Sequence, residues 1–405
     1  MRHTGTPSRF VMRLPPLLVF CACLFVATQA PCAPLASAYK RFIAAENAFS
    51  LACDATGAAW TWGWNNSGQI GNNVTGVDQP IPYRLPGLSG VVAVAAGYSA
   101  SMAVTASGSV LGWGLNASGQ LGTGETGNHP SPVPTGFSGI KAVSMYTHTL
   151  ALAKDGTVWV SGANGNGQLG LGNTDSRSIP IQIPGLSGVQ AVEAGTGFSL
   201  ALKSDGTVWA WGYNFAGQLG QGDTGDRWSP NQILGLSGVV AISTIGSHCL
   251  ALDNQGGVWA WGLNDSGQLG TGDTAPRYWP IKVIGLPPMQ AVAAGVYHSM
   301  ALAVGGVPWA WGGNSGGQLG TGDYGDHYVP VQSPPGKSGY VTLTTGYAHS
   351  MAVDGTGGVW AWGVNGHGCF GNGGTASSPV PVRSLMTLRL PAPGSAAAAM
   401  LLLGN

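Results

Sequence analysis

The segment Trp211-Gly-Tyr-Asn-Phe-Ala-Gly-Gln-Leu-Gly220 decides the fold, because its pattern returns along the chain. Intact copies of Trp-Gly-x-Asn-x-x-Gly-Gln-Leu-Gly also begin at Trp113, Trp261 and Trp311, and altered copies begin at Trp62, Ser161 and Trp362. The second residue of every copy is glycine, and successive glycines lie 51, 48, 50, 50, 50 and 51 residues apart. So steady a period predicts a repeat architecture of seven units.

Each unit contains four short segments with strand character. In the fourth unit these are Val189–Val192, Ser199–Leu202, Val208–Trp211 and Pro230–Ile233. Asp205-Gly206 between the second and third segments is a hairpin signal. Alternation in the third segment places Trp209 and Trp211 on one face of the strand. Four antiparallel strands of this length predict one blade of a β-propeller.

Seven such blades predict an all-β, seven-bladed propeller over residues 39–388. A single blade cannot bury both of its faces, so neighbouring blades must pack on each other around a closed ring. The 68 Gly and 15 Trp of the 405 residues fit many tight turns and large side chains between blades. We expect the first strand at Tyr39–Ile43 and the last at Pro379–Leu388, and a tail at 389–405.

Residues 1–38 are typical of an export signal. Arg2, Arg9 and Arg13 precede the uncharged apolar run Leu14–Val26, and the small residues Ala36-Ser-Ala38 follow. The alternative is an uncleaved anchor, although the apolar run is short for a membrane-spanning helix. We therefore expect a secreted or periplasmic protein with no membrane span in the mature chain.

Charge and cysteine content exclude several classes of protein. Removing the three arginines of the signal leaves 13 basic and 16 acidic residues, which is not the basic balance of a nucleic-acid binder. Beyond the signal, Cys53, Cys249 and Cys369 are too widely spaced for a zinc site and odd in number, which argues against a disulfide framework. Cys53 and Cys249 stand in small, apolar strand segments, so we expect buried thiols there. No nucleophile elbow, phosphate loop or paired-carboxylate pattern is present. We expect no enzymatic activity, no cofactor and no metal.

The repeat, together with Gly-x-x-His-Ser-x-Ala at Gly295–Ala301, resembles the regulator-of-chromosome-condensation repeat over about 350 residues. The resemblance implies the propeller fold more strongly than any one function. The family includes a nucleotide exchange factor, a plant photoreceptor and a secreted inhibitor of an enzyme. These members use a propeller face or rim to dock another protein, which is what the resemblance implies for this chain.

Two sets of aromatic residues are candidate partner-binding sites. By repeat symmetry the first set lies at one end of the ring, in the loop before the second strand: Tyr98, Tyr146, Tyr297 and Tyr347. The second set lies beside cationic residues in units 4 to 6: Trp228, Tyr278, Trp279 and Tyr328. Clustered aromatics favour protein docking or stacking on sugar rings. For the tyrosines, packing beneath the loop is an equal alternative.

Other repeated residues are more simply explained by structure. His148, His248, His298 and His349 share one position, which favours a bond to turn backbone over a metal site. A second position holds His129, Arg177, Arg227, Arg277 and His327. It predicts either a pairing with an acid such as Asp226 or an anion-binding strip. The loop acids Glu125, Asp223, Asp273 and Asp323 predict turn capping better than calcium binding.

The sequence thus predicts a non-enzymatic, exported and monomeric binding module. Its partner would be another protein, such as an envelope component or an enzyme that it inhibits. The alternative is carbohydrate or cell-surface glycan binding through the strip of Trp228, Tyr278 and Tyr328. Nucleotide exchange rests on family analogy alone.

Overall fold

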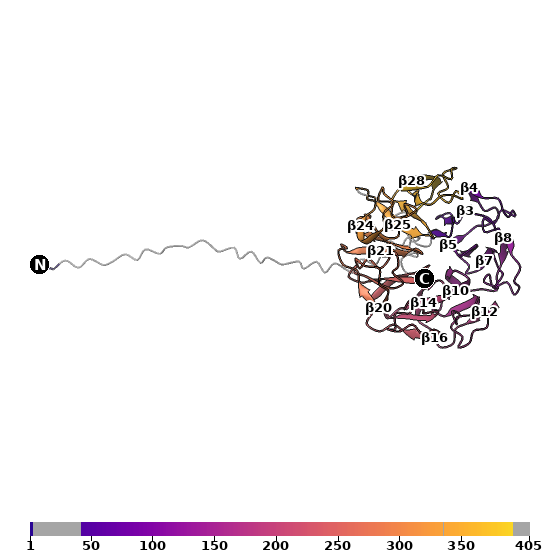
Figure 1. Ribbon diagram of the computed structural model, residues 1–405, viewed down its shortest axis with the longest axis horizontal. Helices are drawn as coiled ribbons and strands as arrows, with labels where there is room; N and C mark the ends of the chain where they lie inside the picture. The colour runs from indigo at the N-terminus through magenta and orange to yellow at the C-terminus, as the bar shows by residue number, and fades with distance from the viewer. Residues whose placement is uncertain (3–41, 335, 392–405) are drawn as a thin grey trace. The chain divides into compact units, whose positions relative to one another are not determined.

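The computed structural model describes residues 1–2, 42–334 and 336–391. These residues form seven four-stranded antiparallel sheets, each built from four consecutive strands, which confirms the predicted propeller. The blades follow one another around the ring in chain order (Figure 1). Most of the predicted signal and of the tail lies outside the described residues. Within the described ones, no helix is long and apolar enough to cross a bilayer.

The strands are numbered along the chain. Blade 1 holds β1 (Ile43–Glu46), β2 (Phe49–Cys53), β3 (Ala59–Gly63) and β4 (Gln79–Arg84); blade 2 holds β5 (Val91–Ala96), β6 (Ala100–Thr105), β7 (Val110–Gly114) and β8 (His129–Pro134). Blade 3 holds β9 (Ile140–Met145), β10 (His148–Ala153), β11 (Val158–Gly162) and β12 (Arg177–Gln182); blade 4 holds β13 (Val189–Ala194), β14 (Phe198–Lys203), β15 (Val208–Gly212) and β16 (Arg227–Gln232). Blade 5 holds β17 (Val239–Ser243), β18 (His248–Asp253), β19 (Val258–Gly262) and β20 (Arg277–Lys282); blade 6 holds β21 (Met289–Ala294), β22 (His298–Ala303), β23 (Pro308–Gly312) and β24 (His327–Gln332). Blade 7 holds β25 (Tyr340–Thr345), β26 (His349–Asp354), β27 (Gly358–Gly363) and β28 (Ser378–Thr387).

The last strand agrees with its prediction, whereas the first does not. We expected the opening strand at Tyr39–Ile43, but β1 begins at Ile43, and residues 39–41 lie outside the described part of the chain. The reason is register: Ile43 pairs with Ala52 and Glu46 pairs with Phe49 around a two-residue turn. The strand therefore extends to that turn, three residues further along the chain than predicted.

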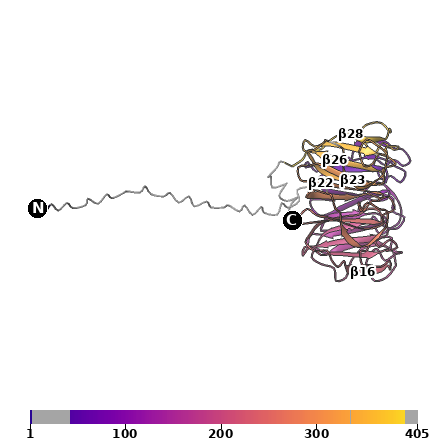
Figure 2. The ribbon, with the colours of Figure 1, turned by 60° about the vertical axis from the view of Figure 1, so that its left-hand side comes forward.

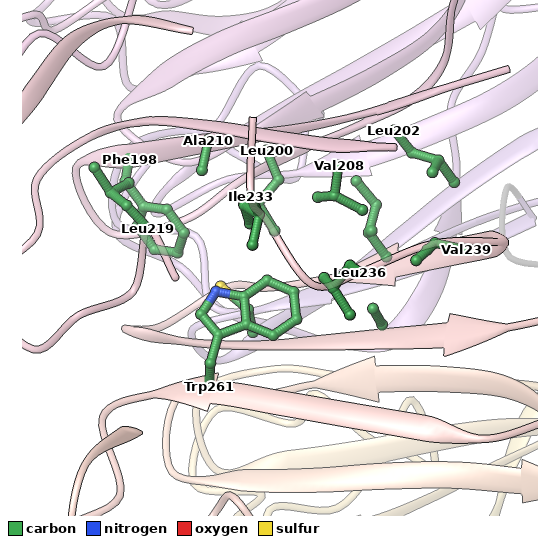
Figure 3. Close-up of a cluster of buried hydrophobic side chains, with 13 residues drawn as sticks. Phe198, Leu200, Leu202, Val208, Ala210, Leu219, Ile233, Leu236, Val239 and Trp261 are labelled. Carbon is green, nitrogen blue, oxygen red and sulfur yellow. The ribbon is translucent and has the colours of Figure 1, made fainter. Parts of the chain in front are cut away.

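The cores lie between blades, not within them. Figure 3 shows one such core, in which Trp261 of blade 5 points towards Leu219, Ile233 and Leu236 of blade 4. The alternation predicted for β15 holds: Trp211 packs with blade 3 on one side, and Val208 packs with blade 5 on the other. Each sheet thus contributes its two faces to two different cores, and every blade depends on both neighbours.

The motif tryptophan bonds each blade to the one before it. Its indole is fully buried, and its Nε1–H donates to the backbone carbonyl of the motif glutamine, or Cys369 in blade 7, in the preceding blade at 2.7–3.0 Å. In blade 3, where serine replaces tryptophan, the Ser161 hydroxyl donates to Gln120 instead. A buried carbonyl needs a partner, so this bond fixes both the spacing and the order of the blades.

The ring closes through the same type of junction. Trp62 of blade 1 and Ser50 both donate to the carbonyl of Cys369 in blade 7. Near the surface, His367 lies 2.7 Å from Asp78 across this junction. In Figure 1 the indigo β4 lies beside the yellow β28, and Figure 2 shows β28 and β16 across the ring from each other. No strand is shared between the first and last described blades, so each end of the propeller contributes a complete sheet.

Candidate functional site

One end of the propeller carries two loops from every blade. Register shows this in blade 4, where Gly212 at the end of β15 pairs with Phe198 at the start of β14 and with Arg227 at the start of β16. The inner turn and the loop that follows the motif tryptophan therefore lie at the same end in each blade. We call this end the motif-loop face.

The motif asparagine shapes the longer of these loops. In blade 4, Asn214 is fully buried, and its Oδ1 accepts the backbone N–H of Leu219 at 2.9 Å. Its Nδ2 donates to the carbonyls of Asp223 and Gly225 at 3.0 and 2.9 Å. One amide thus satisfies three backbone groups and holds a fourteen-residue loop in one conformation.

The motif-loop face has no positive side chain in its loops. Neither the seven inner turns nor the loops 64–78, 115–128, 163–176, 213–226, 263–276, 313–326 and 364–377 contain Lys or Arg. The same long loops contain nine acids: Asp78, Glu125, Asp175, Asp223, Asp226, Asp265, Asp273, Asp323 and Asp326. Within residues 42–334 and 336–391, the arginines at this end stand where the outer strands begin.

The four predicted tyrosines gather in two pairs on this face. The rings of Tyr98 and Tyr146 are 5.9 Å apart at 64°, and those of Tyr297 and Tyr347 are 5.4 Å apart at 88°. The hydroxyls of Tyr297 and Tyr347 lie 3.3 Å apart. Tyr98, Tyr297 and Tyr347 are 38–44% exposed, so they do not simply pack beneath their loops.

The tyrosines stand around one end of a central channel. The inner strands line this channel, which encloses about 310 Å³, mostly with alanine and β-branched side chains. Burial raises the pKa of Tyr146 to about 12, with further effects from Glu46, Tyr98 and Tyr347. These groups come from four different blades, so the inner turns converge at the channel mouth.

The second predicted set lies on the rim. Trp228, Tyr278, Trp279 and Tyr328 are in strands β16, β20 and β24 rather than in loops, and 41–51% of each is exposed. Trp228 packs on Gly167 of the preceding blade, and Tyr278 packs on Gly217 in the same way. Both glycines have positive φ and no room for a Cβ beneath the ring. Blade packing thus accounts for one side of these rings and leaves the other side open.

The repeated histidines join neighbouring blades. His148, His248, His298 and His349 are fully buried, and each Nε2 lies 2.8–3.3 Å from a serine hydroxyl of the next blade. That serine donates to a backbone carbonyl, as Ser350 does to Gln318, so its oxygen accepts from the imidazole N–H. Burial lowers the pKa of the first three histidines to about 3 and that of His349 to about 4. We expected a bond to turn backbone: His349 makes one with Asn47, but the kind of partner that all four histidines share is a side chain.

The cationic column pairs with the loop acids. Arg227 lies 2.5 Å from Asp223, and Arg277 lies 2.7 Å from Asp273. The predicted partner Asp226 is wrong, because its carboxylate accepts the backbone N–H of Asn214 and is occupied there. The loop acids also cap their turns, as predicted: Asp223 accepts from the backbone N–H of Gly225 at 3.1 Å.

The prediction of buried thiols is confirmed for Cys53 and Cys249, and Cys369 is buried as well. Among the described residues, no group of three His, Cys, Asp or Glu side chains converges as metal ligands would. Two features of the motif-loop face escaped the sequence analysis. Tyr213 and Phe215 stack at 5.3 Å, and Glu46 is buried at the channel mouth. Phe215 occupies a variable position of the repeat motif, and an aromatic residue at that position was the sequence signal for the stacked pair.

These features define a seven-bladed propeller with a closed ring and an aromatic end face. The RCC1-like domain model matches residues 28–244, and the regulator of chromosome condensation (RCC1) repeat matches 255–302, 306–353 and 356–390. The chain belongs to the RCC1-repeat family.

Individual relatives match over short segments. Probable E3 ubiquitin-protein ligase HERC3 of Homo sapiens is 42% identical over 84 residues, which are 20% of this chain and 8% of that protein. Ultraviolet-B receptor UVR8 of Arabidopsis thaliana is 37% identical over 84 residues, 20% of this chain and 19% of the receptor. The chain thus matches less than a fifth of the length of either relative.

Solved structures match over most of the propeller. Human WBSCR16 has a TM-score of 0.73 at 25% identity, covering 82% of this chain and 94% of that one. Yeast RCC1 (Prp20), solved bound to Kap60, has a TM-score of 0.74 at 20% identity, covering 96% and 92%. The second likeness is one of fold alone.

Proposed function

We propose that this chain is a non-enzymatic binding module that docks another protein on its motif-loop face. The observation that carries the proposal is the pair of tyrosine contacts at the channel mouth, on an end face without Lys or Arg in its loops. Partly exposed tyrosines on a rigid ring supply contact area at low entropic cost. Yeast RCC1 (Prp20), which has the same fold, was solved bound to Kap60, and this supports a protein partner.

We further propose that the partner is met outside the cytoplasm. Arg2, Arg9 and Arg13 before an apolar run support export. In that setting one version of the function is inhibition, in which the motif-loop face covers the active site of an enzyme. The module itself would need no catalytic group, because occlusion requires only a stable interface.

The test compares the two aromatic surfaces. The full chain, a Tyr98→Ala/Tyr347→Ala variant and a Trp228→Ala/Tyr278→Ala variant would each be used to capture proteins from the envelope and culture fluid of the source organism. We expect a protein that the wild type and the rim variant retain and that the tyrosine variant loses. A partner that all three retain equally would refute docking at the tyrosines.

A second candidate is glycan binding on the rim. Trp228, Tyr278, Trp279 and Tyr328 present open ring faces on adjacent outer strands, and open aromatic faces stack on sugar rings. A glycan array would test this candidate. Binding that disappears with Trp228→Ala would favour it, and the absence of any sugar signal would remove it.

A further inference from the structure

Strand β1 ends at a buried acid at the mouth of the channel. Glu46 is 2% exposed, and the turn that follows it carries Asn47. Its carboxylate accepts the backbone N–H of Asn47, but burial outweighs this bond and raises the pKa of Glu46 to about 8. None of the ion pairs among the described residues includes Glu46. A buried carboxyl without a cation is costly, and such groups are usually paired.

The turn after Glu46 lies next to tyrosine-bearing turns of neighbouring blades. The Asn47 side chain donates to the carbonyl of Tyr98 at 3.3 Å, which ties the turn after Glu46 to blade 2. On the other side, Gly346 packs against the backbone of Glu46 and precedes Tyr347 of blade 7. Glu46 also contributes to the raised pKa of Tyr146, which places that hydroxyl within electrostatic reach. An acid close to aromatic residues is an arrangement that can recognise an organic cation.

Among the described residues, the loops of this face supply no lysine or arginine for Glu46. The inner turns and the long loops of the motif-loop face contain nine acids and no Lys or Arg. This charge balance is complementary to a basic surface and would speed its approach. A lysine fits the mouth better than an arginine, because its ammonium is a compact charge on a slender stem.

We propose that Glu46, Tyr98, Tyr146 and Tyr347 form a site for the ammonium group of a lysine side chain on the docked protein. The proposal rests on the proposed docking function of the same face and names the chemistry of the partner. The ammonium would pair with the Glu46 carboxylate and lie against the tyrosine rings, which replaces its lost hydration.

Binding would release a proton. Glu46 is protonated in the free protein below about pH 8, and an ammonium favours its ionised form. The other titratable groups near it are Tyr146, whose pKa its charge affects, and His349 on β26, which bonds the backbone of Asn47. Tyr98 and Tyr347 lie on the neighbouring turns. Tyr146, with a pKa of about 12, and His349, with one of about 4, both stay neutral between pH 6 and 8. Lysine binding is therefore expected to tighten as the pH rises from 6 to 8.

The test uses two matched probes, Nα-acetyl-lysine methylamide and its uncharged analogue, Nα-acetyl-norleucine methylamide. Calorimetry of the full chain at pH 7 in phosphate and in Tris would give the Kd and the number of protons released. We expect the lysine probe to bind at least about tenfold more tightly than the norleucine probe, with a proton released. Glu46→Gln should lose that preference and the proton release together.

Tyr347→Leu is the second variant, since this side chain is 44% exposed and its removal leaves the core intact. It should weaken lysine binding several-fold and keep the proton release. Equal affinity for the two probes, or unchanged binding by both variants, would overturn the site. If the tyrosine variant still loses its protein partner while the probes bind alike, docking stands and only the lysine site fails.

Discussion

The buried histidines should make the propeller sensitive to acid, and His298 allows a clean test. It is fully buried in the neutral form, with a pKa of about 3 compared with 6.5 when exposed. Below pH 6.5 this histidine binds a proton in the unfolded chain but stays neutral in the folded chain. The free energy of unfolding therefore falls as the pH falls. Between pH 7.5 and 4.5 this amounts to about 2.7 kcal/mol for one histidine, because each pH unit below the unfolded pKa contributes about 1.36 kcal/mol.

The perturbation is His298→Phe, because the fold itself accepts phenylalanine at this position in blade 4. Phe198 is fully buried there and packs against Gly195, as His298 packs against Gly295. At pH 7.5 the variant loses the 2.9 Å bond to Ser350 and should be about 1 kcal/mol less stable. At pH 4.5 it should be more stable than the wild type by roughly 1 to 2 kcal/mol, because the phenylalanine does not bind a proton in the unfolded chain.

The assay is urea unfolding followed by tryptophan fluorescence at pH 7.5, 6.5, 5.5 and 4.5. Other titrating groups are common to both proteins and cancel in the difference. A difference in unfolding free energy that does not change with pH would refute the argument. The reciprocal variant Phe198→His serves as a control. It buries a further histidine, so the free energy of unfolding should depend more strongly on pH. Cys249 stands where other blades offer a serine to the histidine.

Three further predictions concern single side chains. Trp311→Phe removes the donor to the buried carbonyl of Gln268 at 2.8 Å and should cost about 2 to 4 kcal/mol in urea unfolding, whereas the same change at half-buried Trp309 should cost much less. Glu46→Gln should stabilise the fold at pH 7 and have little effect at pH 4. This follows because a carboxyl whose folded pKa is about 8 loses stability as the pH rises above its unfolded value of about 4.5. Arg277→Gln breaks an exposed ion pair and an exposed hydrogen bond to the carbonyl of Ala275, and it should change the thermal unfolding temperature very little.

The repeat alone predicts the fold because each copy encodes one local unit. The spacing of the motif glycines, the Asp205-Gly206 hairpin and the alternation around Trp209 and Trp211 concern residues close in sequence, whose geometry follows from short-range rules. The structure confirms seven four-stranded sheets from these signals. It also places the two tryptophans on one side of the strand, with Val208 on the other.

Contacts between blades could not be derived in the same way. The bond from Trp211 to the carbonyl of Gln168 spans 43 residues, and that from His148 to Ser199 spans 51. Repeat symmetry shows that such residues occur at equivalent places, but not which neighbour each one faces. The partner of Arg227 was mistaken for a local reason: Asp226 is adjacent in sequence, but its carboxylate accepts the backbone N–H of Asn214, and the arginine pairs with Asp223.

The candidate site was predictable in part. Symmetry indicated that Tyr98, Tyr146, Tyr297 and Tyr347 share one end of the ring. Their contact with one another depends on the small radius of the inner turns, which only the closed ring determines. Glu46 lay outside the prediction, since a single acid at a strand end looks like a solvated residue until its neighbours are known.

Ring closure between two complete blades has a consequence for how the chain can be connected. Since no sheet of the described residues combines strands from the two ends, the junction of blades 7 and 1 is held by packing and hydrogen bonds without a peptide link. A circular permutant that joins residue 391 to residue 42 through a short linker and opens the chain between β16 and β17 would keep all seven sheets continuous. The order of blades around the ring is structural, whereas the choice of the first blade is only a matter of where the chain happens to be cut.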